Sequence, residues 1–132
     1  MANSPSKFLA GKRALIVGVA NERSLAWSIA EHLHAAGCEL AFTYLGEALE
    51  RRVRPLAESV GAKLILPMNA QSDTEMDAAF GKIKETWGSL DILIHSVAFA
   101  NREDLEGRFV DTSRAGYLLA MDVSAYSLVA MS

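Results

Sequence analysis

Four short apolar segments alternate with amphipathic segments along this chain, and the alternation limits its fold more than any other feature. The apolar segments cover residues 13–19, 39–44, 63–68 and 90–97. The first and last of them are β-branched and almost continuously apolar, which is typical of strands buried on both faces of a parallel sheet. Strands that alternate with helices over short connections form right-handed crossovers. The sequence therefore predicts the α/β class, with helices on both faces of a doubly wound parallel sheet.

Three helices are expected, at residues 24–36, 46–60 and 73–87, and each has one apolar face. These faces consist of Leu25, Ile29 and Leu33, then of Leu49, Val53, Leu56 and Val60, and then of Met76, Phe80, Ile83 and Trp87. Gly37 and Gly88 follow the first and third segments, as expected at helix ends. Pro55 lies inside the second segment and predicts a kink or a split there. A polar loop at 99–110 leads to a final helical segment from residue 112 to the end.

The turn at residues 18–24 joins the first strand to the first helix, a place where α/β proteins bind phosphates. Gly18 has no Cβ, so a pyrophosphate has room to lie against the backbone. The Ser24 hydroxyl is expected to cap the helix and to reach a phosphate oxygen. An ordinary turn with a serine cap explains the same residues, and the turn by itself does not decide between the two.

Ligands of open α/β sheets lie beyond the carboxyl ends of the strands, so the other candidate segments are 44–47, 68–71 and 96–100. The common G-x-G-x-x-G pattern is absent, because no second glycine occurs between Gly18 and Gly37. Leu45 stands where a carboxylate would bind a ribose 2′-hydroxyl, and Glu47 is the nearest acid. No Arg or Lys follows the second strand directly, which argues against a cofactor with a 2′-phosphate.

Composition limits the class of partner and the compartment. The 132 residues suffice for one domain, 1–132, and the net charge of −3 gives no broad surface for nucleic acid or an anionic membrane. Cys38 is the only cysteine and is expected to be a half-buried structural thiol, which favours a reducing, cytoplasmic location. The first residues lack the apolar core of a signal peptide, and no apolar stretch is long enough to cross a bilayer. No metal site is expected.

Several segments together resemble the bacterial enoyl-[acyl-carrier-protein] reductases, which are divergent short-chain dehydrogenases/reductases with a glycine-poor cofactor loop. The segments are GVANERSLAWSIA at 18–30, ELAFTY at 39–44, LDILIHSVAF at 90–99 and DVSAYS at 122–127. The resemblance covers residues 8–132 in order. It implies a Rossmann-type domain that binds NADH, and an enoyl thioester substrate on acyl carrier protein in fatty-acid elongation.

The resemblance also implies roles for individual positions of this sequence. Gly18, Ser24 and Leu25 would line the pyrophosphate and the adjoining ribose, and Leu45 would lie beside the adenosine ribose. Asn69 and Ala70 would contact adenine, Val97 would approach the cofactor ribose, and Ala100 would border the acyl pocket. Without the resemblance, Leu45 and Val97 would be core residues and Asn69 a turn residue. His95 is expected to be a core histidine with a satisfied hydrogen bond.

The reductases use a tyrosine followed several residues later by a lysine, and none of the tyrosines Tyr44, Tyr117 and Tyr126 has such a partner. No catalytic residue is therefore assigned, and Tyr126 is expected in helix packing or a subunit interface. The uncapped last helix, together with an unprotected fourth strand in the order 3-2-1-4, predicts the front half of a longer protein. The family implies a homo-tetramer at full length. The alternatives are a non-catalytic nucleotide-binding or assembly module, and a related reductase with another substrate.

Overall fold

The computed structural model describes residues 7–132 and contains a sheet of four parallel strands. The strands are β1 (Arg13–Val17), β2 (Glu39–Tyr44), β3 (Leu64–Pro67) and β4 (Ile92–His95), in the order β3-β2-β1-β4. The α/β class and the expected strand order are confirmed, and β4 forms an edge of the sheet. The prediction that the chain begins without a signal segment concerns residues 1–6, which lie outside the described residues.

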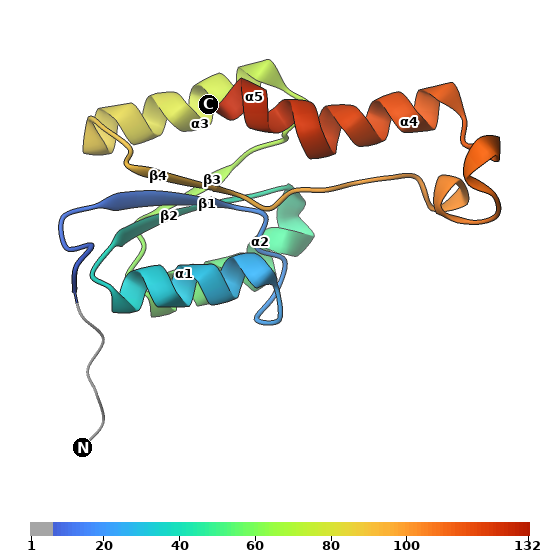
Figure 1. The fold of residues 1–132 in the computed structure, drawn as a ribbon. Helices are drawn as coiled ribbons and strands as arrows, with labels where there is room; N and C mark the ends of the chain where they lie inside the picture. The colour runs from blue at the N-terminus through green and yellow to red at the C-terminus, as the bar shows by residue number, and fades with distance from the viewer. Residues whose placement is uncertain (1–6) are drawn as a thin grey trace.

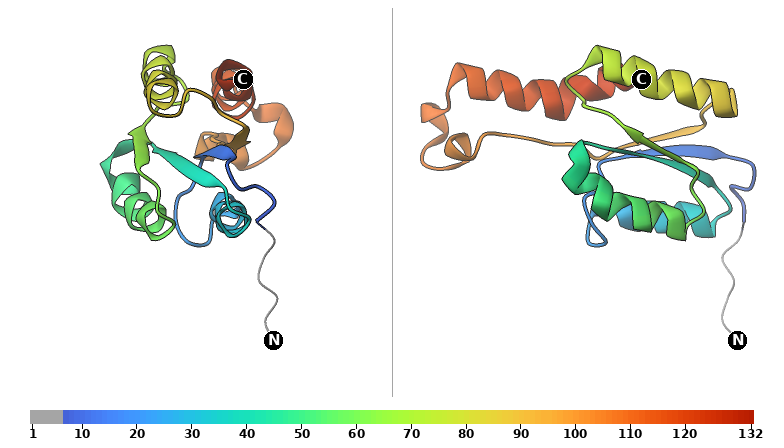
Figure 2. Two further views of the ribbon diagram at one scale, coloured as in Figure 1. Left: turned by 90° about the vertical axis from the view of Figure 1, so that its left-hand side faces the viewer. Right: turned by 180° about the vertical axis from the view of Figure 1, so that it is seen from behind.

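Helices cover both faces of the sheet (Figures 1 and 2). One face carries α1 (Leu25–Ala35) and α2 (Gly46–Ser59), and the other carries α3 (Asp73–Trp87) and α5 (Ser127–Met131). Because side chains of a strand point alternately to opposite faces, Ala14 and Ile16 of β1 pack under α1 and α2, whereas Leu15 and Val17 pack under α3 and α5. The fold therefore has two hydrophobic cores, one on each side of the sheet.

The buried face of α1 is not the one that the spacing predicts. Leu25 is 80% exposed and Ile29 is also exposed, whereas Ala26, Trp27 and Ala30 are buried. The alanines have little volume and face the sheet, and the Trp27 ring packs against Phe42 with ring centroids 6.0 Å apart. Of the expected stripe, Leu25 and Ile29 are therefore wrong, whereas Leu33 is half-buried and packs against this core as predicted.

The other two helices follow the prediction more closely. Helix α2 is continuous through Pro55, which is exposed, so the predicted split is wrong. Val53 is fully buried, as expected. Helix α3 buries Met76 and Ile83 and ends at Gly88, whose φ of +77° gives the left-handed cap that glycine adopts readily.

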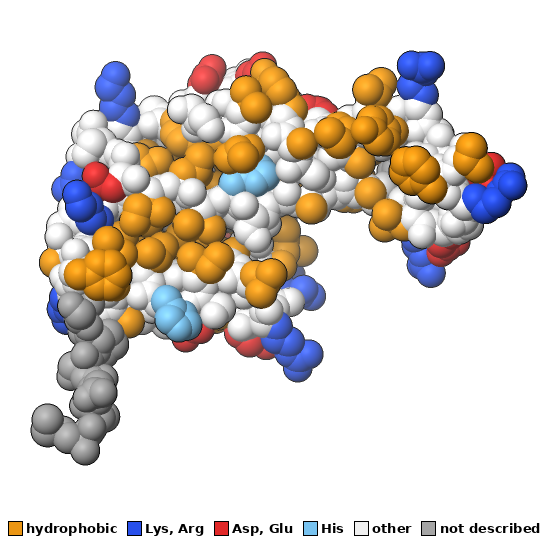
Figure 3. Space-filling model, viewed as in Figure 1, with side chains coloured by type: hydrophobic (Ala, Val, Ile, Leu, Met, Phe, Trp, Pro, Cys, Tyr) orange, Lys and Arg blue, Asp and Glu red, His pale blue; other side chains and the backbone are white. Residues whose placement is uncertain are grey.

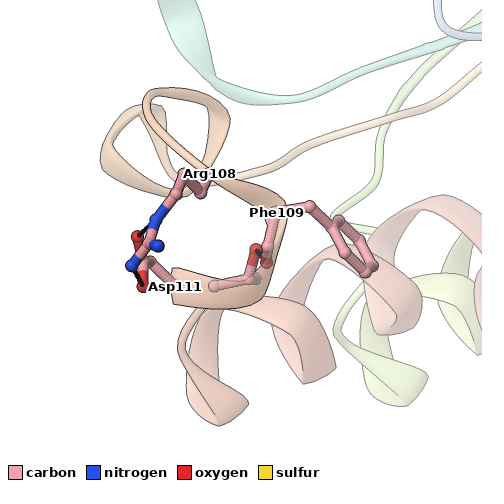
Figure 4. Close-up of polar contacts among 4 residues, drawn as sticks. Arg108, Phe109 and Asp111 are labelled. Carbon is pink, nitrogen blue, oxygen red and sulfur yellow. Dashed lines mark hydrogen bonds and ion pairs between the residues drawn. The ribbon is translucent and has the colours of Figure 1, made fainter.

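The chain after β4 leaves the sheet as an extended arm, residues 99–121, which projects beyond the rest of the molecule (Figure 1). It contains two 3₁₀ turns, η1 (Arg102–Leu105) and η2 (Phe109–Asp111), and helix α4 (Arg114–Met121). Arg108 forms a two-point ion pair with Asp111 across η2, and the ring of Phe109 points away from that pair and is 86% exposed (Figure 4). A π-helical turn, η3 (Asp122–Tyr126), separates α4 from α5, so the predicted final helix is interrupted.

Hydrophobic side chains gather over the β4 edge and α1, and again along the arm (Figure 3). None of the helices within residues 7–132 is long and apolar enough to span a membrane. Cys38 is 5% exposed and therefore more deeply buried than expected. Burial, followed by the nearby charges of Asp91 and Glu39, raises the pKa of the Cys38 thiol.

Candidate functional site

The carboxyl ends of all four strands meet at a cleft of about 420 Å³. All four segments that the sequence singled out contribute residues to its wall. The wall consists of Val17, Gly18, Val19, Ala20, Thr43, Tyr44, Leu45, Leu49, Met68, Asn69, Ala70, Gln71, Ser96, Val97, Ala98, Phe99 and Val123. The topology explains this meeting, since parallel strands end at the same side of a sheet.

Gly18 is required by the packing of β1 against β4. Its φ is +112°, and a Cβ there would overlap the carbonyl group of Ser96. The Ser96 N–H donates to the carbonyl of Val17 at 2.9 Å, which brings the two strand ends together. The backbone of Ser96 fills the position that a Cβ would take, so the strand packing alone requires glycine here; the expectation that a pyrophosphate lies against the Gly18 backbone stays a prediction.

Ser24 occupies the N-cap position of α1, but its side chain does not cap the helix. Its Oγ instead accepts hydrogen bonds from the N–H groups of Ala20 at 2.9 Å and Asn21 at 3.1 Å. The predicted cap is wrong because the loop folds back and its own N–H groups reach the hydroxyl first. The hydroxyl hydrogen and the first N–H groups of α1 are left to donate to an anion.

Leu25 and Leu45 differ in their positions relative to the cleft. Leu25 is exposed and does not line the cleft. Leu45 is 56% exposed and lines the cleft directly after β2, so it is not a core residue.

Asn69 and Ala70 both line the cleft at the end of β3. The Asn69 side chain forms a local turn, because its Oδ1 accepts a hydrogen bond from the Gln71 N–H at 2.9 Å. The turn interpretation of Asn69 is therefore confirmed.

Val97 and Ala100 differ in their relation to the cleft. Val97 is half-buried, packs against the core on the α3 side of the sheet and also lines the cleft. Ala100 is also half-buried but does not line the cleft, whereas the preceding residue, Phe99, does.

Sequence reasoning missed the contribution of the π-helical turn η3. Val123 of this turn is buried and lines the cleft, and the Ser124 Oγ accepts a hydrogen bond from the Phe99 N–H at 3.0 Å. The available signal was the DVSAYS segment, which carries serines in an otherwise apolar helix. The resemblance of this segment to the reductases implied no role for Val123 or for the two serines.

The side chain of His95 bonds to Ser127, the first residue of α5, which directly follows this turn. The His95 Nε2 lies 2.7 Å from the Ser127 Oγ, and this hydroxyl donates to the carbonyl of Val123 at 2.6 Å. Because the hydroxyl has one hydrogen, Nε2 is the donor to Ser127. The expectation of a satisfied histidine is confirmed. Tyr126 is largely exposed, so its expected role in helix packing is wrong and the subunit interface stays a prediction.

Comparisons with known proteins agree with this geometry. The family model described as Enoyl-(Acyl carrier protein) reductase matches residues 18–132. An enoyl-[acyl-carrier-protein] reductase [NADH] FabI from Nostoc is 50% identical over 127 residues, which cover 94% of this chain and 49% of that protein.

Two solved structures extend the likeness to the fold. A reductase from Anaplasma phagocytophilum in complex with NAD has a TM-score of 0.92 and 43% identity, with 98% of this chain and 50% of that chain covered. The Bacillus cereus enoyl-acyl carrier protein reductase, with NADP⁺ and an indole naphthyridinone, has a TM-score of 0.90 and 51% identity, with 94% and 49% covered. The chain spans about half the length of the curated relatives that it matches. By sequence and by fold, the chain belongs to the enoyl-(acyl carrier protein) reductase family.

Proposed function

We propose that this chain is the cofactor-binding half of an NADH-dependent reductase that acts on trans-2-enoyl thioesters of acyl carrier protein in fatty-acid elongation. The observation that supports this most directly is the cleft at the strand ends, beside the N-terminus of α1 and a loop ordered by Ser24. A helix N-terminus favours anions through its free N–H groups and its dipole. The reaction that we propose is the one for which the Nostoc relative is named.

A dinucleotide placed across these strand ends would have its pyrophosphate beside residues 18–25. Gly18, Ser24 and Leu25 would contribute through backbone N–H groups and the Ser24 hydroxyl. The adenosine half would extend past Leu45 toward Asn69 and Ala70, because the ends of β2 and β3 lie on that side of β1.

The nicotinamide half would lie past Val97 at the end of β4, with the acyl chain near Ala100. When bound, NADH supplies the hydride that is transferred to the β-carbon of the enoyl thioester. Leu45, Gly46 and Glu47 offer no cation to a 2′-phosphate, which supports NADH over NADPH. Because the Bacillus cereus structure contains NADP⁺, the preference is tested on this chain with both nucleotides.

The proton-donating tyrosine and its lysine would lie in a part of the protein outside these 132 residues, since no tyrosine here has a lysine several residues later. It treats 1–132 as a single, incomplete dinucleotide-binding domain. It also includes a cytoplasmic location, supported by the single cysteine, and a homo-tetramer at full length. Exposed hydrophobic side chains on α4 and α5, such as Tyr117, Leu118 and Leu128, support the tetramer.

Two preparations test the proposal: the 132-residue chain, and the protein made from the whole reading frame that contains it. We expect the longer protein to consume NADH when crotonyl thioester is added, as followed by NADH absorbance, and to prefer NADH to NADPH. We expect the short chain to show no turnover. Turnover by the short chain would contradict the assignment of catalysis elsewhere. A longer protein that binds nucleotide without reducing the thioester would instead be a binding or assembly module.

A further inference from the structure

The π-helical turn η3 connects the last helix to the ends of two strands. Such turns are rare, and they occur often at functional sites because they break the helical register. The Asp122 carboxylate accepts a hydrogen bond from the Gln71 side chain after β3, at 3.4 Å. Ser127, which directly follows the turn, accepts one from His95 of β4. The turn is thus fixed relative to the sheet on both sides of Val123.

Ser124 makes the most specific of these connections. Its Oγ accepts a hydrogen bond from the Phe99 N–H at 3.0 Å and donates one to the Phe99 carbonyl at 3.3 Å. One hydroxyl therefore satisfies both backbone groups of a residue that lies beyond the end of β4. These two bonds define the backbone path of Phe99 at the point where the chain leaves the sheet and enters the arm.

The residue that Ser124 orders belongs to the cleft wall. Phe99 and Val123 both line the cleft, and Phe99 directly follows the tail of β4, so it lies at the β4 end. In the orientation of the cofactor proposed above, this end faces the nicotinamide and the substrate. The adenosine half lies at the opposite end, near β2 and β3.

We infer that Ser124 is a positioning residue for the enoyl substrate: its hydroxyl orders the backbone of Phe99 and thereby sets the shape of the acyl side of the cleft. This inference rests on the proposed function. Ser124 itself does not line the cleft, so it would act through Phe99. Loss of its hydroxyl should weaken substrate binding and leave nucleotide binding nearly unchanged.

The test compares Ser124→Ala with Ser124→Thr in the protein made from the whole reading frame. Threonine retains the hydroxyl, whereas alanine removes both hydrogen bonds. Ser59→Ala is the matched control, because the Ser59 hydroxyl bonds only to the Leu56 carbonyl of its own helix. The measured quantities are kcat, KM for crotonyl thioester, KM for NADH, Tm, and amide hydrogen exchange at Phe99.

We expect Ser124→Ala to raise KM for the thioester by about three- to tenfold, the range that corresponds to losing one or two net hydrogen bonds. In the same variant, KM for NADH should stay within about twofold of the wild-type value, and amide exchange at Phe99 should become faster. Ser124→Thr should keep the wild-type values, because it retains the hydroxyl. If Ser124→Ala does not fold, Ser124→Cys replaces it with the same expectations, because a thiol is a weak donor and acceptor.

An unchanged KM for the thioester would overturn the inference, as would equal increases in both KM values together with a lower Tm. A wild-type Phe99 amide that exchanges as fast as the alanine variant would also overturn it. A wild-type protein without NADH-dependent turnover would refute the proposed function, and this inference with it. The wild-type measurement therefore distinguishes the failure of the function from the failure of Ser124 alone.

Discussion

The carbonyl group of Ser96 occupies the position that a Cβ of Gly18 would take. This contact joins the turn after β1 to the tail of β4, and both segments line the cleft. A substitution at Gly18 therefore changes the fold of the cleft before it changes any contact with a ligand. Gly18 is a probe of packing, and Ser24 is the cleaner probe of anion binding.

Gly18→Ala should lower the free energy of unfolding by about 2–4 kcal/mol, because it combines a left-handed φ with a backbone overlap. Urea denaturation of the 132-residue chain measures this. Gly81→Ala is the control: Gly81 is an exposed residue of α3 with open space at its Cβ position. That substitution should raise stability by up to about 1 kcal/mol. Equal effects of the two substitutions would contradict the Ser96 contact.

Ser24→Ala should weaken NADH binding about tenfold, since the loop N–H groups of Ala20 and Asn21 lose their acceptor and the anion loses a donor. Fluorescence titration of the full-length protein with NADH gives the Kd. Ser28→Ala, one turn further along α1 on an exposed position, should leave the Kd unchanged. A Kd that does not respond to Ser24→Ala would place the pyrophosphate elsewhere.

Stability should fall with rising pH through the titration of Cys38. Its native pKa lies above the ordinary value of 9.0, mainly because of burial, so the native chain retains a proton that the unfolded chain releases first. The stabilisation that this difference in proton binding provides is fully present below the pKa of the unfolded chain and is lost as the pH rises through the native pKa. Urea denaturation between about pH 8 and about pH 10 should show that the free energy of unfolding falls more steeply with pH for wild type than for Cys38→Ala. Parallel declines would contradict the prediction.

Ser127→Ala should lower the free energy of unfolding by about 1–3 kcal/mol, because the buried hydroxyl bonds to both His95 and the Val123 carbonyl. Ser132→Ala removes the same kind of bond, to the carbonyl four residues earlier, at an exposed position. We expect this control to change the stability by less than about 0.5 kcal/mol. Similar losses in the two variants, measured by thermal unfolding, would show that the His95 contact contributes nothing.

The helices illustrate where sequence reasoning succeeds and where it fails. Met76 and Ile83 were placed correctly on the buried face of α3, because spacing determines which residues of a helix share a face. The same reasoning chose the wrong face for α1, where Trp27 with Ala26 and Ala30 fits the sheet better than Leu25 and Ile29. Spacing does not report how closely a helix approaches its sheet.

The alternation of apolar and amphipathic segments by itself determined the α/β class and the side of the sheet on which ligands gather, because local periodicity and the handedness of crossovers leave few other arrangements. Only the tertiary structure decided what individual residues of the cleft do. The backbone of Ser96 fills the space where a Cβ of Gly18 would lie, and the Ser24 hydroxyl accepts hydrogen bonds from its own loop. The Ser124 hydroxyl bonds to Phe99 from a segment distant in the sequence. Each of these contacts depends on how closely separate segments approach one another, and no pattern along the chain contains those distances.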